Sequence, residues 1–339
     1  MKKKFFSILR FTFFLGIGIF FIWLFLRNLT STEKHEIIYS LKNANYFWII
    51  IVVFIGIFSH YIRAIRWRML LEPLGYQPRK ANVFFSVFIG YLANMVLPRL
   101  GEVSRCGVLT RYEKIPFNKG FGTVITERAV DMVVFFLIFF VNTIFQASRL
   151  YSYIEQKVYQ PFSVKFNHAA DFSGSIKIII FSGLILLVVL FFLFRKKIIY
   201  SRFYTKIKTM LLGFLEGIKS LMGIKKPRLF IFYSLLIWFC YLLMSFLVFF
   251  AMPATKQLGL DAGISVLIFG TIGIMLVQGG IGIYPAIVAE TLFIYGIPEV
   301  SGYAMGWLIW ISQTITILII GPLSTILLPI YNKHSYGKN

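Results

Sequence analysis

Charged residues are scarce in this chain, and acidic residues are the scarcest. Only 14% of its 339 residues are charged, against roughly 25% in ordinary soluble proteins. Hydrophobic residues make up 58% of the chain and the mean hydropathy is +0.78. A soluble domain of this length would leave much of that apolar surface in water. The composition therefore excludes a soluble protein and predicts an integral membrane protein.

Cysteine and histidine are also few, and neither forms a recognisable motif. The two cysteines, Cys106 and Cys240, lie far apart, and the four histidines are scattered. Metal sites and disulfide frameworks need close, regular spacings, so no metal and no disulfide is expected. The chain also lacks a nucleophile elbow, a P-loop and an H-x-E motif. We therefore expect no catalytic residue and no cofactor, and we do not expect an enzyme.

Basic residues outnumber acidic ones by 35 to 13, which gives a formal net charge of +22. A nucleic-acid-binding protein would gather such an excess on one folded polar face. Here the basic residues fall between apolar runs, so no nucleic-acid partner is expected. The excess is instead typical of cytoplasmic loops that face anionic lipid headgroups.

Six apolar runs are long enough to cross roughly 30 Å of hydrocarbon as helices. They are residues 7–26, 47–70, 120–145, 176–194, 229–252 and 302–330. The first follows three lysines and has no cleavage site after it, so it is expected to be an uncleaved signal anchor.

Two further apolar segments are too short to cross the membrane as single helices. Residues 82–97 lead into Leu97–Gly101, and residues 263–277 lead into the glycine loop Gln278–Gly282, followed by a second short run to Ile297. Short runs interrupted by Gly or Pro are typical of re-entrant or broken helices. The predicted fold is thus an all-α membrane protein with about six spanning helices and two re-entrant elements, eight apolar segments in all.

Loop charges predict the orientation of these segments. Residues 195–228 carry ten basic residues against one acid, and residues 61–119 carry ten against three. Both regions are therefore expected in the cytoplasm, with both termini, at the cell (inner) membrane. The number of membrane crossings agrees with these loop locations only if neither short element crosses the membrane or if both cross it. In the first case the single domain 1–339 consists of inverted halves, about 7–147 and 176–331.

Ionisable side chains cluster between residues 94 and 131, where each costs about 2.5–3.5 kcal/mol in a membrane. Glu102 and Arg105 share one helix face, and Glu127 and Asp131 share another, with Arg128 beside them. Like carboxylates repel each other unless a cation intervenes, and Arg99 and Arg105 are the expected cations. Two interpretations remain open. The cluster is an ion-pair network that joins two helices, a site where guanidinium groups bind an anionic headgroup, or both, since the two interpretations are compatible.

Other polar residues are harder to assign from the sequence. The glycines of the Gln278–Gly282 loop either bind an anion through backbone N–H groups or simply break the helix. Glu290, the carboxylate in the following apolar run, is a candidate partner for an arginine from the first half. Arg63, Arg66, Trp67 and Arg68 are expected to be interfacial anchors. Gly302 and Gly306 fit a helix-packing notch.

The motifs Asn94–Arg105, Glu127–Asp131 and Gly279–Gly282 resemble the lysylphosphatidylglycerol synthase transmembrane-region family over about residues 10–330. This is the membrane half of the multiple-peptide-resistance factors, which also occurs as free-standing proteins. The resemblance implies movement of an anionic or aminoacylated phospholipid between leaflets. It does not imply the synthase activity, because the chain ends at Asn339 without the soluble transferase domain. Many members also carry a carboxylate where Tyr284 stands here.

From the residues and this resemblance together we predict a lipid flippase. The expected substrate-binding residues are Asn94, Pro98, Arg99, Gly101, Glu102, Arg105, Glu127, Arg128, Asp131, Gly279, Gly280, Gly282, Tyr284 and Glu290. The alternative is a membrane-embedded accessory or transferase protein for lipid-linked sugar or aminoacyl-lipid synthesis. Phospholipids are the expected partners, and the sequence leaves open a separate lipid-modifying enzyme and a homodimer.

Overall fold

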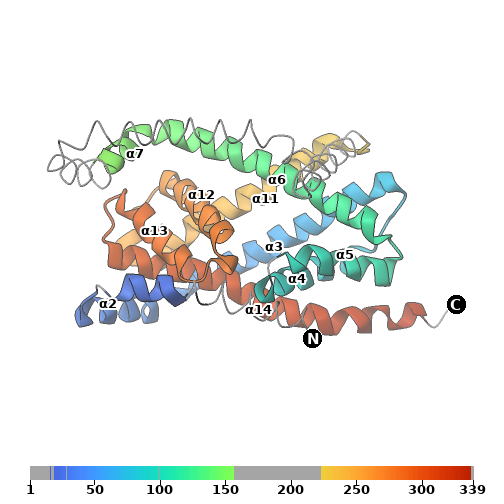
Figure 1. The fold of residues 1–339 in the computed structure, drawn as a ribbon, viewed down its shortest axis with the longest axis horizontal. Helices are drawn as coiled ribbons and strands as arrows, with labels where there is room; N and C mark the ends of the chain where they lie inside the picture. Colours follow the sequence, from blue (N-terminus) through green and yellow to red (C-terminus); the bar gives the residue numbers. More distant parts are fainter. Residues whose placement is uncertain (1–15, 17–18, 28, 98, 156–222, 337–339) are drawn as a thin grey trace, which may run out of the picture. The chain divides into compact units, whose positions relative to one another are not determined.

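The computed structural model describes residues 16, 19–27, 29–97, 99–155 and 223–336. The described residues form helices and turns, with no strand, which confirms an all-α membrane protein (Figure 1). Its α-helices are α2 (Ser31–Lys42), α3 (Tyr46–Leu71), α4 (Lys80–Val96), α5 (Leu100–Glu113), α6 (Phe117–Phe145), α7 (Ala147–Ile154), α11 (Pro227–Leu247), α12 (Leu260–Leu276), α13 (Ile283–Phe293) and α14 (Glu299–Tyr336).

Three of the described helical segments are long and apolar enough to cross a membrane. They are Tyr46–Leu74, Pro227–Ala251 and Glu299–Lys333, which correspond to the predicted spans 47–70, 229–252 and 302–330. The predicted span 120–145 lies within α6, whose middle carries three ionised residues. The predicted span 176–194 and most of 7–26 lie outside the described residues, as does the basic loop 195–228 up to residue 222.

The chain divides into two compact units, 1–142 with 217–339 and 143–216. The site described below belongs to the first unit.

Both short apolar segments form the first arm of a broken helical element, as predicted. Between α4 and α5, Leu97 is extended and Arg99 adopts a left-handed backbone conformation (φ 64°). Between α12 and α13, the glycine loop has positive φ at Gly279, Gly280 and Gly282. Glycine reaches these angles without steric cost, so this loop reverses the chain within a few residues.

Helices α4 and α5 form a tight hairpin whose two arms are in close contact at glycine residues. A Cβ atom at Gly101 would lie 2.2 Å from the carbonyl oxygen of Gly90 and 2.6 Å from the side chain of Asn94. The Asn94 side-chain oxygen accepts a hydrogen bond from the backbone N–H of Gly101 at 2.7 Å. Asn94 and Gly101 therefore hold the two arms together at the level of the break.

Replacing Gly101 with alanine is expected to force these arms apart and to destabilise the protein by about 1–3 kcal/mol or more, because overpacked contacts against backbone cannot relax easily. Thermal unfolding in detergent measures the loss. The matched control is Gly107→Ala on the same helix, where a Cβ atom meets nothing within 4 Å. Equal unfolding midpoints for the two variants would contradict the close packing of this hairpin.

Helices α3 to α6 and α11 to α14 follow the same order at a constant offset. Tyr46, Lys80, Leu100 and Phe117 begin the first set, and Pro227, Leu260, Ile283 and Glu299 begin the second, each roughly 180 residues later. Each set reads long helix, broken hairpin, long helix (Figure 1).

Contacts between the two sets are those of antiparallel helices. Trp48 near the start of α3 packs on Phe250, just after the end of α11, with ring centroids 5.0 Å apart. Arg66 near the end of α3 donates to Ser234 near the start of α11 at 3.1 Å. The corresponding first helices of the two sets therefore run in opposite directions, as an inverted repeat requires.

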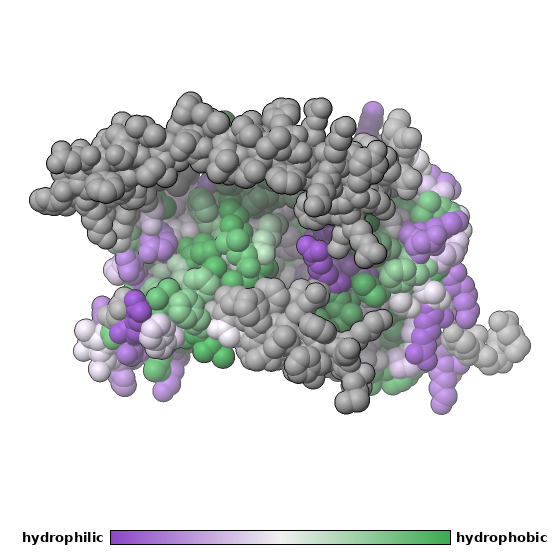
Figure 2. Space-filling view, viewed as in Figure 1, coloured by the Kyte–Doolittle hydropathy of each residue, from purple (hydrophilic) through white to green (hydrophobic). Residues whose placement is uncertain are grey.

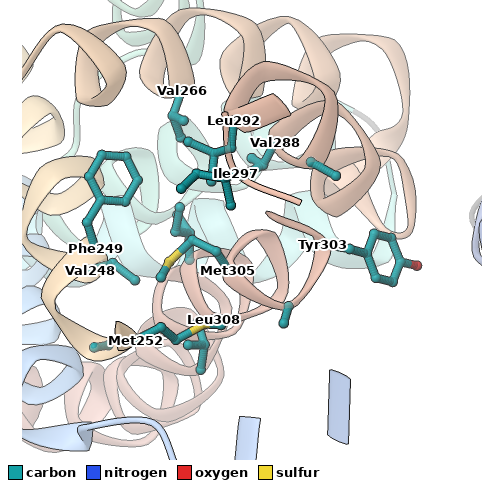
Figure 3. Close-up of a cluster of buried hydrophobic side chains, with 14 of the residues drawn as sticks. Val248, Phe249, Met252, Val266, Val288, Leu292, Ile297, Tyr303, Met305 and Leu308 are labelled. Atoms are coloured by element: carbon teal, nitrogen blue, oxygen red, sulfur yellow. The ribbon is translucent and has the colours of Figure 1, made fainter. Parts of the chain in front are cut away.

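Two hydrophobic clusters fill spaces between these helices. One joins residues of α11, α12, α13 and α14 with the turn after α11, including Phe249, Val266, Leu292 and Met305 (Figure 3). The other joins α3, α4, α5 and α6 around Trp67, Val87, Leu109 and Val124. Gly302 and Gly306 pack α14 directly against the α13 backbone, since a Cβ at Gly306 would lie 2.5 Å from the Cα of Pro285. The predicted packing notch is confirmed.

Candidate functional site

A buried ion network joins α3 and α6. Arg63 of α3 contacts both carboxylates of the shared face on α6, Glu127 at 2.5 Å and Asp131 at 2.8 Å. Its other terminal nitrogen donates to the hydroxyl of Tyr241 on α11 at 3.1 Å. Arg63 is 3% exposed and Glu127 is fully buried. The four-residue spacing of the two carboxylates thus lets one guanidinium bridge them.

Two further arginines complete the network. Arg66, fully buried, lies 2.7 Å from Asp131 and 3.6 Å from Glu127. Arg105 of α5 contacts the second oxygen of Glu127 at 2.5 Å. Its guanidinium also lies 3.8 Å from the ring centroid of Trp67, which is a cation–π contact. The network therefore ties the α4–α5 hairpin to both long helices.

The charges of this network do not cancel. Arg63, Arg66 and Arg105 contribute three positive charges, whereas Glu127 and Asp131 contribute two negative ones. The neighbouring pair of Arg128 and Glu102, at 3.0 Å, is neutral in sum and more open to its surroundings. One positive charge is thus left over among the described residues of the network. An excess charge held away from water is costly unless an anion balances it.

The prediction of interfacial anchors is wrong for Trp67, which is fully buried, and for Arg63 and Arg66. Both arginines point into the protein, because their three-residue spacing places them on the same face of α3, opposite the carboxylates of α6. Arg63 lies roughly 12 Å along the helix axis from the end of α3. Two arginines at helical spacing, matched to two carboxylates at helical spacing elsewhere, are the signal that could have found this pairing.

The expected role of Arg99 as a cation between the carboxylates is also wrong. Its side chain is exposed, and the ion pairs of the network do not include it. It sits in the helix break with a left-handed backbone, one residue before α5 begins. Of the two expected cations only Arg105 joins the carboxylates.

A cavity of about 460 Å³ lies against this network. Arg63, Asp131 and Arg128 lie on its charged side, together with His60, Tyr91 and Tyr241. Tyr284, Gln313 and Thr316 add polar groups from the second set of helices. The rest of the lining is mainly apolar, including Phe135, Met244 and Leu267. A chamber of this composition suits a molecule with one polar end.

Several buried polar atoms on the cavity wall lack hydrogen-bond partners among the described residues. They include Nε of Arg63, the indole nitrogen of Trp238 and Nδ1 of His60. Buried polar groups are normally satisfied, so these atoms would gain from a partner, but they are themselves buried and a ligand in the cavity would reach them only after the side chains move. The Arg63 and Trp238 groups are N–H donors, which match the oxygens of an anion.

The structure places only part of the predicted site at this cavity. Arg128, Asp131 and Tyr284 line it, while Glu102, Arg105 and Glu127 belong to the ion pairs behind it. Asn94 and Gly101 close the hairpin, and Glu290 is exposed on α13. Pro98 lies outside the described residues. Sequence reasoning missed His60, Arg63, Tyr241 and Gln313.

The glycine loop does not line the cavity. The indole of Trp310 donates to the carbonyl of Gly279 at 2.6 Å, which ties the loop to α14. A Cβ at Gly280 would lie 3.1 Å from Ile274 and from Tyr284. The two glycines therefore serve the tight break, which was one of the two interpretations of this loop.

These features define a polytopic helical membrane protein with an ion network beside an internal, partly polar cavity. The chain belongs to the family described as the lysylphosphatidylglycerol synthase TM region, which matches residues 8–321. This membership agrees with the resemblance seen in the motifs. It identifies the chain as a membrane protein of a family whose description refers to a lipid synthase.

Two curated relatives match a limited stretch of the chain. The UPF0104 membrane protein MJ1595 of Methanocaldococcus jannaschii is 32% identical over 103 residues, which is 30% of this chain and 31% of that protein. Glycosyltransferase AglD of Haloferax volcanii is 29% identical over 102 residues, which is 30% of this chain and 16% of that protein. The chain thus aligns with less than a third of either relative. No solved structure matches the chain.

Proposed function

We propose that this protein is a lipid translocase that moves a phospholipid with an anionic or aminoacylated headgroup between the leaflets. The observation that carries the proposal is the positive charge of the buried network that the described residues leave unbalanced, and that reaches the cavity through Arg63. A phosphate bound there would balance that charge, and guanidinium is well suited to bind it through parallel hydrogen bonds.

The cavity would lower the main barrier to lipid movement. Carrying a charged headgroup through hydrocarbon is costly, because nothing there replaces its water. A headgroup against Arg63 and Arg128 keeps favourable electrostatic contacts, while Phe135 and Leu267 offer apolar surface to the chains. The protein thus needs to supply an environment and a path, and no covalent step.

Reconstitution tests the proposal. Purified protein in liposomes is expected to expose fluorescent phosphatidylglycerol of the inner leaflet to an external reductant, which protein-free vesicles do not. Phosphatidylcholine, whose headgroup has no net charge, is expected to move more slowly. A rate equal to that of protein-free vesicles for both lipids, and for an aminoacylated phosphatidylglycerol, would rule the translocase out.

The second candidate is an accessory or transferase protein for lipid-linked sugars. The similarity to glycosyltransferase AglD favours it, although the matched stretch is 16% of that protein. A transferase would need an accessible carboxylate as acid or base. Glu127 is fully buried between two arginines, and Asp131 is paired with two, which supports the translocase instead. Sugar transfer by the purified protein would reverse this preference.

We place the protein in the cytoplasmic membrane with both termini inside, because the basic segments 61–119 and 195–228 favour the cytoplasm. A cysteine introduced at Lys225 is then expected to react with an impermeant maleimide only after the membrane is opened. Residues 28–46 carry two basic residues balanced by two acids and are placed outside, so a cysteine at Lys34 is expected to react in intact cells. The reverse pattern would invert the proposed topology.

A further inference from the structure

The cavity reaches the outer surface of the protein between α6 and α12. Met132 of α6 and Met275 of α12 both line the cavity, yet they are 51% and 63% exposed. Ile274 beside them also lines it and is exposed. Side chains that face an internal cavity and the exterior at once mark its mouth. This mouth is made of apolar groups, although the cavity behind it is partly charged.

The mouth arises because α12 ends early. Further along the two helices, Asn142 of α6 accepts a hydrogen bond from Ser265 of α12 at 3.2 Å. Phe135 and Leu267 then share one buried hydrophobic cluster. Beyond Leu276 the chain turns into the glycine loop, so α6 loses its neighbour at the level of Met132. Helices α6 and α12 are therefore in contact at Asn142 and Ser265, and they separate at the mouth near Met132.

The surface of α6 around the mouth is apolar and exposed. Val133, Phe136 and Leu137 are all on it, with Phe140 further along. In a membrane protein such side chains contact acyl chains. The mouth is continuous with this surface. On the face drawn in Figure 2, hydrophilic side chains lie mainly at the two ends, with a small patch near the middle beside hydrophobic ones.

The corresponding seam of the inverted set is packed at two levels. It lies between α4 and α14, where a Cβ at Gly321 would lie 2.9 Å from the Cβ of Leu92. Asn82 and Asn332 exchange hydrogen bonds at 3.0 and 2.8 Å further along the same seam. The α4–α14 seam is therefore packed at these two levels, and Phe139 and Ile272 pack on one hydrophobic cluster in the α6–α12 seam.

We infer that the α6–α12 mouth is a lateral portal occupied by the acyl chains of a membrane phospholipid whose headgroup lies in the cavity. The inference rests on the proposed translocase function and adds the route by which the lipid enters. A lipid bound in this way keeps its chains against apolar side chains and in the bilayer, and only its headgroup crosses into the protein. The thioethers of Met132 and Met275 are flexible and adapt to differing chains.

A covalent bridge across the portal tests the inference. Met132→Cys/Met275→Cys, joined by a bifunctional maleimide, is expected to lose phosphatidylglycerol transport down to the rate of protein-free vesicles. The matched control, Asn142→Cys/Ser265→Cys, bridges the same two helices where they already touch, and is expected to transport normally. Cys106 and Cys240 are buried, and the unsubstituted protein treated alike corrects for them. Undiminished transport by the bridged portal variant would overturn the inference.

A binding measurement separates failure of the portal from failure of the translocase. Phosphatidylglycerol with a photoactivatable diazirine in one acyl chain is cross-linked to the wild-type protein in liposomes, and the adducts are mapped by mass spectrometry. Adducts enriched at Met132, Ile274 and Met275 over the lipid-facing residues of α3 support the portal, even if no transport is seen. Adducts spread evenly over all exposed apolar positions overturn it, even if transport is robust.

Discussion

Replacing Glu127 with glutamine is expected to cause the largest loss of stability of any single substitution in the network. Glu127 contacts Arg63 and Arg105 at 2.5 Å and is fully buried. Without its charge, three guanidiniums share the one carboxylate of Asp131. Removing one partner of a buried ion pair costs about 3–5 kcal/mol, because the remaining charge stays buried and unbalanced.

The expected measurement is a thermal unfolding midpoint in detergent that falls on the order of 10 °C, together with a smaller monodisperse fraction. Glu36→Gln is the control, since Glu36 is an exposed carboxylate on α2. The two variants make the same chemical change in opposite environments. A Glu127→Gln midpoint within the error of the Glu36→Gln midpoint would mean that the network does not hold α5 and α3 against α6.

Replacing Arg63 with glutamine is expected to cause a modest loss of stability and a large loss of transport. The remaining charges cancel, because Arg66 still contacts Asp131 at 2.7 Å and Arg105 still contacts Glu127 at 2.5 Å. The cavity, however, loses the guanidinium that faces it. A hydrogen bond to a charged group contributes about 1.5–3 kcal/mol, so transport of phosphatidylglycerol should fall at least about tenfold.

Transport rates in liposomes of matched protein content measure this effect. The control is Arg228→Gln, which removes an exposed arginine at the start of α11, outside the cavity lining. Phosphatidylcholine transport should change much less than phosphatidylglycerol transport in Arg63→Gln, which separates loss of anion binding from general damage. An equal loss for both lipids would point to a structural role of Arg63 alone.

Much of the fold could be predicted from the sequence because membrane insertion leaves strong local signals. Long apolar runs predicted three of the described helices, and Gly or Pro at the end of short runs predicted both breaks, at Leu97 and at Gly279. Loop charges and the count of crossings predicted inverted halves, and α3–α6 and α11–α14 share one order of helices. The four-residue spacing of Glu127 and Asp131 predicted one common face.

The partners of those carboxylates could not be predicted so easily. Helix α3 is apolar on nearly all sides, so its hydrophobic pattern does not tell which way Arg63 and Arg66 point. Their place near the end of an apolar run also fits an interfacial anchor equally well. The prediction that Arg99 pairs with the carboxylates was wrong for another reason. This residue stands in a motif with Gly101 and Glu102, but the left-handed turn at the break leaves its side chain exposed.

The cavity itself was beyond sequence reasoning, because residues from distant helices form it. Tyr241, Tyr284 and Gln313 meet Arg63 only through the packing of α11, α13 and α14 around α3. None of these three stands in a charged motif, and a Tyr or Gln in an apolar helix is more often a packing residue than a ligand. Only the antiparallel arrangement of the two helix sets brings these groups together.

Binding of a single anionic lipid at Arg63 is the central claim, and native mass spectrometry in detergent tests it most directly. The wild-type protein, offered equal amounts of phosphatidylglycerol and phosphatidylcholine, should retain one phosphatidylglycerol after gentle activation. Arg63→Gln should retain neither lipid preferentially, while staying folded. A wild-type protein without preference, or an Arg63→Gln variant with the same preference as the wild type, would contradict the account.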